Sequence, residues 1–65
     1  MKVFKGKTVE FKQDTPDVMV VYSVGQAAVL LGKIKSGVKP YKLETEQHAK
    51  FSSEQLAEIG AGMHD

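Results

Sequence analysis

The sequence predicts an α+β protein, in which an antiparallel meander sheet of four to five strands is followed by one C-terminal helix. Runs rich in β-branched and aromatic residues fill residues 1–43 and are separated by Gly, Pro and Asp, which favour turns. Strong helix signals occur only after residue 51. The chain has 65 residues and no cysteine, so we expect a single domain with a small core and no disulfide.

The first expected element is a β-hairpin over residues 3–12, with Gly6 in its turn. In its second arm Val9 and Phe11 alternate with polar residues, which is the period of a strand buried on one side. A break between strands is expected around Pro16, because proline restricts both its own backbone and that of the residue before it.

The next three strands are predicted from composition and turn residues. Residues 18–24 are mostly β-branched or aromatic and should form the central strand. A two-residue turn at 25–26, which begins with glycine, would lead into a returning strand at 27–35. Residues 38–43 should form an edge strand, because Pro40 has no backbone N–H to give to a sheet.

The C-terminal helix has the clearest signals in the chain. A polar connection at 44–51 leads to a helix expected at 52–62. Ser52 should cap this helix, and Gln55, three residues later, should complete a capping box. The apolar stripe expected to face the sheet consists of Leu56, Ile59 and Met63.

The two central strands, 18–24 and 27–35, are apolar on both faces, and one short helix can cover only one of them. The sheet should therefore curl into a small SH3-like barrel with the N-terminal hairpin folded across it, or a second molecule should cover the other face. The candidate interface residues are Met19, Val21, Val29 and Leu31. The principal expectation is a small non-enzymatic interaction module that forms a homodimer or binds another protein.

Charge is unevenly distributed along the chain, although the net charge is only +1. Residues 1–43 carry eight lysines and three acids, whereas residues 44–65 carry one lysine and five acids. The strands expected at 27–43 would display a basic ridge consisting of Lys33, Lys35, Lys39, Tyr41 and Lys42. This ridge predicts contact with nucleic-acid phosphates as an alternative function. A sheet followed by a C-terminal helix is also similar to the arm-binding domains of some phage integrases, which implies DNA as the partner.

Residues 22–32 offer a rival interpretation. They resemble the opening of MerR-type and excisionase-type winged-helix DNA-binding proteins, and the residues that carry this resemblance are Tyr22, Ser23, Val24, Gly25, Gln26 and Gly32. Residues 50–56 look like the segment that follows the wing in the same families. The resemblance implies a helix over 25–32 and DNA binding, in place of the turn and strand described above. Gly37 and Pro40 would interrupt the recognition helix that these families need next.

Few residues point to catalysis or metal binding. Neither His48 nor His64 has a second ligand at metal-binding spacing, and Ser52 is expected to act as a helix cap. We therefore expect no catalytic residue, no metal and no cofactor. Residues 1–5 lack the apolar run of a signal peptide, and no segment is apolar enough to span a membrane, which predicts a cytoplasmic protein.

Overall fold

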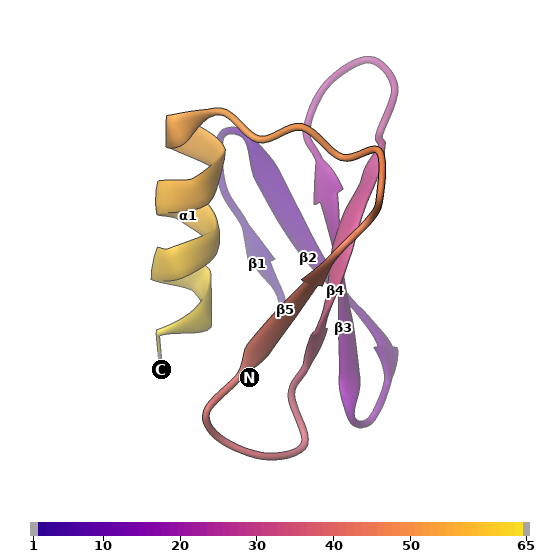
Figure 1. The fold of residues 1–65 in the computed structure, drawn as a ribbon, viewed down its shortest axis with the longest axis vertical. Coiled ribbons are helices and arrows are strands. Elements are labelled where there is room, and N and C mark those ends of the chain that lie inside the picture. The colour runs from indigo at the N-terminus through magenta and orange to yellow at the C-terminus, as the bar shows by residue number, and fades with distance from the viewer. Residues whose placement is uncertain (1, 65) are drawn as a thin grey trace.

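The computed structural model describes residues 2–64, which form a five-stranded antiparallel sheet and one helix (Figure 1). The elements in chain order are β1 (Phe4–Lys5), β2 (Val9–Thr15), β3 (Val18–Ser23), β4 (Leu30–Lys35), β5 (Lys42–Thr45) and α1 (Ser53–Met63). Each strand pairs with the next one in sequence, so the sheet is a meander with the order β1-β2-β3-β4-β5. The predicted fold class, an antiparallel meander with a C-terminal helix, is confirmed.

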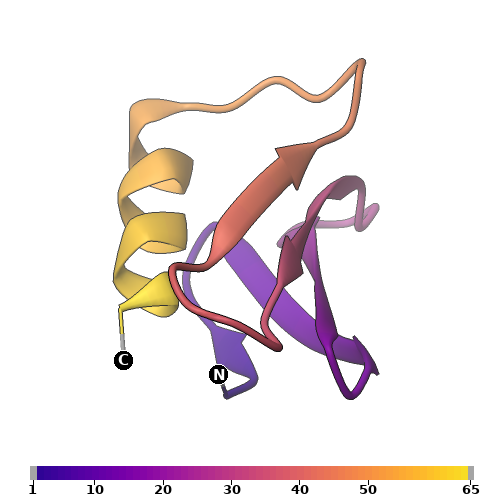
Figure 2. The same ribbon diagram turned by 60° about the horizontal axis from the view of Figure 1, so that its bottom comes forward.

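The sheet is strongly curled, as an SH3-like sheet is, but does not close into a barrel (Figures 1 and 2). Helix α1 lies along the open side of the curl. Side chains from both ends of the meander, Phe4 in β1 and Leu43 in β5, pack against the same buried cluster as the helix. The curl and the helix together therefore enclose one core.

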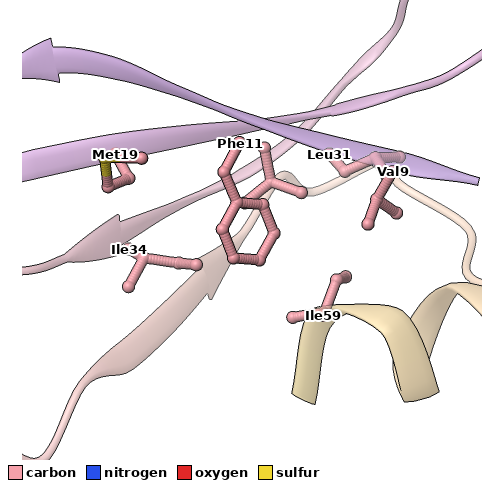
Figure 3. Close-up of a cluster of buried hydrophobic side chains, with 7 residues drawn as sticks. Val9, Phe11, Met19, Leu31, Ile34 and Ile59 are labelled. Atoms are coloured by element: carbon pink, nitrogen blue, oxygen red, sulfur yellow. The ribbon is translucent and has the colours of Figure 1, made fainter. Parts of the chain in front are cut away.

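The core lies on the concave inner face of the sheet. Directly opposed residues of an antiparallel pair share a face, and Phe11 in β2 opposes Val21 in β3, as Met19 opposes Ile34 in β4. All four side chains are at most 1% exposed. Ile59 from α1 closes the cluster from the open side (Figure 3). The complete buried cluster consists of Val9, Phe11, Met19, Val21, Leu31, Ile34 and Ile59.

A bulge in β4 changes the faces expected for this strand. Strict alternation places Leu31 and Ile34 on opposite faces, yet both are buried in the same core. The β3–β4 register shifts between Val21 and Tyr22, which pair with Gly32 and Leu30, so Leu31 is the extra residue. The bulge therefore turns an additional leucine inward and enlarges a small core.

Residues 22–32, for which the sequence offers two interpretations, contain neither the expected two-residue turn nor a helix. Residues 24–29 form a loop, and β4 begins only at Leu30. Ser23 closes this loop twice, because its N–H donates to the Val29 carbonyl at 2.9 Å and its Oγ accepts from the Val29 N–H at 3.0 Å. The winged-helix interpretation of residues 25–32 is wrong, and the strand interpretation holds from Leu30 onward.

The other strand boundaries also differ from the prediction. Strand β2 continues through Asp14 to Thr15, so the break expected around Pro16 begins only after Thr15, and the register with β3 shifts between Gln13 and Thr15. Strand β5 covers Lys42–Thr45 rather than 38–43. It begins beyond Pro40, which follows a cis peptide bond and has no N–H to pair.

Helix α1 begins as predicted. The Ser52 hydroxyl accepts from the Gln55 N–H at 3.1 Å, and the Gln55 side chain accepts from the Ser52 N–H at 2.9 Å, so the capping box is complete. The buried stripe is narrower than expected, because Ile59 is 3% exposed whereas Leu56 is 53% exposed. Met63 is partly buried against the same cluster, so the helix faces the core with Ile59 and Met63.

Two contacts hold α1 against the β1–β2 hairpin. Gly62 lies directly on the tilted ring pair of Phe4 and Phe11, so that a Cβ at this glycine would be 2.6 Å from a ring carbon of Phe11. The Glu58 carboxylate accepts from the Thr8 N–H, with its two oxygens at 3.0 and 3.2 Å. This backbone hydrogen bond lowers the pKa of Glu58, because it favours the charged carboxylate.

Candidate nucleic-acid interface

The convex face of the sheet, opposite the core, is the most basic surface that the strands form. The strand register identifies its residues, because a residue that directly opposes an outward-facing residue of the neighbouring strand also faces outward. We call this surface the outer face. It consists of Lys5, Glu10, Lys12, Thr15, Val18, Val20, Tyr22, Leu30, Lys33, Lys35, Lys42 and Glu44.

The five lysines of the outer face come from every strand except the central one. Strands β1, β2, β4 and β5 supply Lys5, Lys12, Lys33, Lys35 and Lys42. The central strand β3 instead supplies an apolar stripe, which consists of Val18, Val20 and Tyr22. Lysines therefore flank an apolar and aromatic stripe on both sides.

The residues opposite the stripe on β2 and β4 show how close the lysines lie to it. Val20 directly opposes Lys12 in β2 and Lys33 in β4, and it is only 8% exposed although it points away from the core. The aliphatic stems of the two lysines can cover it while their ammonium groups stay in water. The Lys12 ammonium also lies 5.4 Å from the centre of the Tyr22 ring, within the range of a cation–π contact.

Acidic groups neutralise this surface only in part. The outer face carries two glutamates, and Glu44 forms an ion pair of 3.2 Å with Lys35. Both of these side chains are more than half exposed, so water weakens their attraction and Lys35 can exchange its partner. Helix α1, on the open side of the sheet, carries two glutamates and no lysine. The molecule is therefore dipolar, with its positive side on the outer face.

The structure brings together part of the basic ridge that the sequence predicted. Lys33, Lys35 and Lys42 are exposed on the outer face. Lys39 instead lies in the connection between β4 and β5, where its ammonium is 5.8 Å from the centre of the Tyr41 ring. Tyr41 packs against the core cluster and does not belong to the outer face.

Sequence reasoning missed three outer-face residues, Lys5, Lys12 and Tyr22. A signal for two of them was present, because Lys12 alternates with Val9 and Phe11 along one strand, and Tyr22 alternates with Met19 and Val21 along the next. Their proximity to Lys33 depends on the pairing of β2, β3 and β4 and is not visible in the sequence order.

The candidate interface for self-association is corrected by the structure. Met19 and Val21 are 0% exposed and Leu31 is 3% exposed, because the curl and α1 enclose them. Only Val29 is exposed, at 54%, in the loop between β3 and β4. The apolar face that was expected to need a second molecule is the protein's own core.

Elsewhere the structure offers little that resembles a chemical site. An open groove of about 630 Å³ lies between the β4–β5 connection and the end of α1, and it is lined by Lys39, Pro40, Tyr41, Gly60, Met63 and His64. His48 is exposed in the connection before α1. Within residues 2–64, no three His, Cys, Asp or Glu side chains gather as a metal site. Over the same residues, no helix has the length and apolar character needed to cross a membrane.

Comparison with known proteins adds no family to this description. No protein-family model, no curated protein and no solved structure matches the chain. The outer face is therefore the basis on which a function can be proposed.

Proposed function

We propose that this protein is a non-enzymatic module that binds nucleic acid through the outer face of its sheet. The observation that carries the proposal is the arrangement of the five outer-face lysines around the apolar stripe of β3. Positive charge gathered on one face supplies the affinity for phosphates in protein–nucleic acid complexes. The acidic helix on the opposite side favours one orientation of the molecule toward a polyanion.

The composition of the outer face supports a binding role rather than a purely structural one. Lysines on edge strands also prevent sheets from pairing edge to edge, but Lys33 and Lys35 lie on β4 and are paired with both β3 and β5. Protection of edges does not account for lysines at these positions. With no arginine in the chain, recognition rests on phosphate contacts more than on bidentate reading of bases.

The proposal predicts salt-dependent binding that depends on Lys33. We expect a fluorescently labelled oligonucleotide to bind with an affinity that falls steeply with salt, because each neutralised phosphate releases a counterion. Lys33→Gln keeps part of the aliphatic stem at the position opposite Val20 but removes the charge. It should lower the slope of log Kd against log salt by about 1. Fluorescence anisotropy titrations at several salt concentrations measure this slope.

Lys50→Gln is the matched control, because it removes the same charge from an exposed lysine in the connection before α1. We expect it to leave the slope unchanged. Equal effects of the two variants would indicate attraction by net charge alone. Binding that ignores salt would contradict the proposed function.

A further inference from the structure

The apolar stripe of β3 distinguishes the outer face from a surface that only attracts phosphates. Val18, Val20 and Tyr22 are successive outward residues of one strand, so they are spaced by about 6.6 Å. Tyr22 is half-buried and stands at the end of the stripe. A purely electrostatic site has no use for an aromatic ring at this position.

The lysines lie where the phosphates of a chain running along the stripe would pass. Lys12 and Lys33 oppose Val20 from the two sides, and Lys35 opposes Val18 from the β4 side. Opposed residues in an antiparallel sheet have Cβ atoms about 5 Å apart, which is within reach of a lysine side chain from the stripe. The cation–π contact of Lys12 with Tyr22 is weak at an exposed site. A stacked base can therefore replace it while the ammonium turns to a phosphate.

The apolar surface continues beyond Tyr22. Leu30 opposes Tyr22 from β4, and the loop at 24–29 contains no charged residue. Val24 and Val29 in this loop are 40% and 54% exposed. The loop projects past the end of the sheet in Figure 1, beyond the end of β3 that carries Tyr22.

We infer that the outer face binds single-stranded nucleic acid along β3, with a base stacked on Tyr22 and the flanking lysines on the phosphates. This inference rests on the proposed function and narrows it to one class of nucleic acid. Aromatic rings between basic residues are the means by which proteins bind single strands without reading their sequence. A duplex keeps its bases stacked on one another, so it would contact the lysines and leave Tyr22 unused.

The test compares two single strands that differ in their bases but not in their phosphates, with a duplex as the third probe. The probes are an oligo(dT) of about twelve nucleotides, an abasic oligonucleotide of the same length and a duplex of the same length. We expect wild-type protein to bind oligo(dT) about tenfold more tightly than the abasic chain. Tyr22→Ala should lose this advantage without changing the affinity for the abasic chain, and Tyr22→Phe should keep it.

Tyrosine fluorescence gives a second measurement, because the chain contains two tyrosines and no tryptophan. In a Tyr41→Phe variant the emission comes from Tyr22 alone. Oligo(dT) should quench this emission, and the abasic chain should quench it much less. Circular dichroism of each variant establishes that the fold is retained.

Each outcome separates this inference from the proposed function. Salt-dependent binding of oligo(dT) and of the abasic chain with equal affinity, unaffected by Tyr22→Ala, would overturn the stacking of a base and leave phosphate binding intact. Absence of binding to every probe would overturn both. Sedimentation with phosphatidylserine vesicles, without binding to oligo(dT), would also overturn both and would identify an anionic lipid surface as the partner of the lysines and the uncharged loop.

Discussion

The two faces of the sheet are built from the same strands and yet meet different surroundings. On the inner face, Met19 and Ile34 are 0% exposed and lie against the helix-covered core. On the outer face, Lys33 is exposed to solvent and directly opposes Val20, which the stems of lysines can cover. Stability and the proposed binding therefore depend on neighbouring residues of one strand. Substitutions one position apart should affect different properties.

The largest difference in stability is expected between substitutions at Ile34, on the inner face, and at Lys33, on the outer face. Ile34→Ala removes buried methyl groups and leaves a cavity, which should lower the free energy of unfolding by about 2–5 kcal/mol. A domain of this size has little stability to spare, so the variant should unfold at a much lower urea concentration than the wild-type protein. Urea denaturation followed by circular dichroism measures the loss.

Lys33→Gln is the matched substitution on the outer face, and its unfolding free energy should change by no more than about 0.5 kcal/mol. The same variant carries the expected loss of oligonucleotide affinity. The division between the faces fails if Ile34→Ala is as stable as the wild-type protein. It also fails if Lys33→Gln is destabilised as strongly as Ile34→Ala.

Local signals in the sequence were sufficient for the fold class. Alternation of Val9 and Phe11 with polar neighbours reflects a strand with one buried side, and it is independent of the rest of the chain. The capping box of Ser52 and Gln55 is likewise complete within four residues. Both features were predicted correctly because the forces that produce them act between near neighbours.

Features that depend on pairing between distant residues were not predicted. The bulge at Leu31 exists because β4 must keep Ile34 opposite Met19 while Leu30 opposes Tyr22, and alternation along β4 alone cannot show it. The outer face has the same origin. Lys12 and Lys33 are distant in sequence, and only the central position of β3 places them on the two sides of Val20.

Two glycines of α1, Gly60 and Gly62, differ in the space beside them and so test how tightly the inner face is closed. A Cβ at Gly62 would be 2.6 Å from a ring carbon of Phe11, whereas a Cβ at Gly60 would have no neighbouring atom within 4 Å. Gly62→Ala should therefore push the helix away from the Phe4–Phe11 pair and cost about 1–3 kcal/mol.

Gly60→Ala should have the opposite sign, because alanine favours a helix over glycine by up to about 1 kcal/mol when it meets no obstacle. Thermal unfolding of the two variants side by side measures the difference. A stabilised Gly62→Ala protein would show that the helix can move off the phenylalanines without loss, and that the inner face is less tightly closed than its burial indicates.

The smallest change in stability is expected at Glu58, which connects α1 to the turn between β1 and β2. Its carboxylate accepts from the Thr8 N–H, and this bond lowers the pKa of Glu58 in the folded protein. The group is therefore more acidic in the folded than in the unfolded chain. Its contribution to stability is complete above the unfolded-state pKa and is lost as the pH falls through the lowered folded-state pKa.

Glu58→Gln removes the titration but keeps an oxygen that can accept from Thr8. We expect the variant to be less stable than the wild-type protein at neutral pH, because a neutral acceptor bonds an N–H more weakly than a carboxylate does. The difference should shrink as the pH is lowered and the wild-type carboxyl is protonated. Urea denaturation at neutral pH and at about pH 3 measures this change.

Glu54→Gln provides the control, since Glu54 is an exposed glutamate in the first turn of the same helix. If Glu54→Gln lost as much stability as Glu58→Gln, the effect would belong to the charge of the helix rather than to the bond with Thr8. A difference for Glu58→Gln that stayed constant down to acid pH would rule out the charged carboxylate as its source. If the loss of stability becomes smaller at acid pH for Glu58→Gln alone, a charged hydrogen bond holds the helix over the core. This contact does not involve the lysines of the outer face.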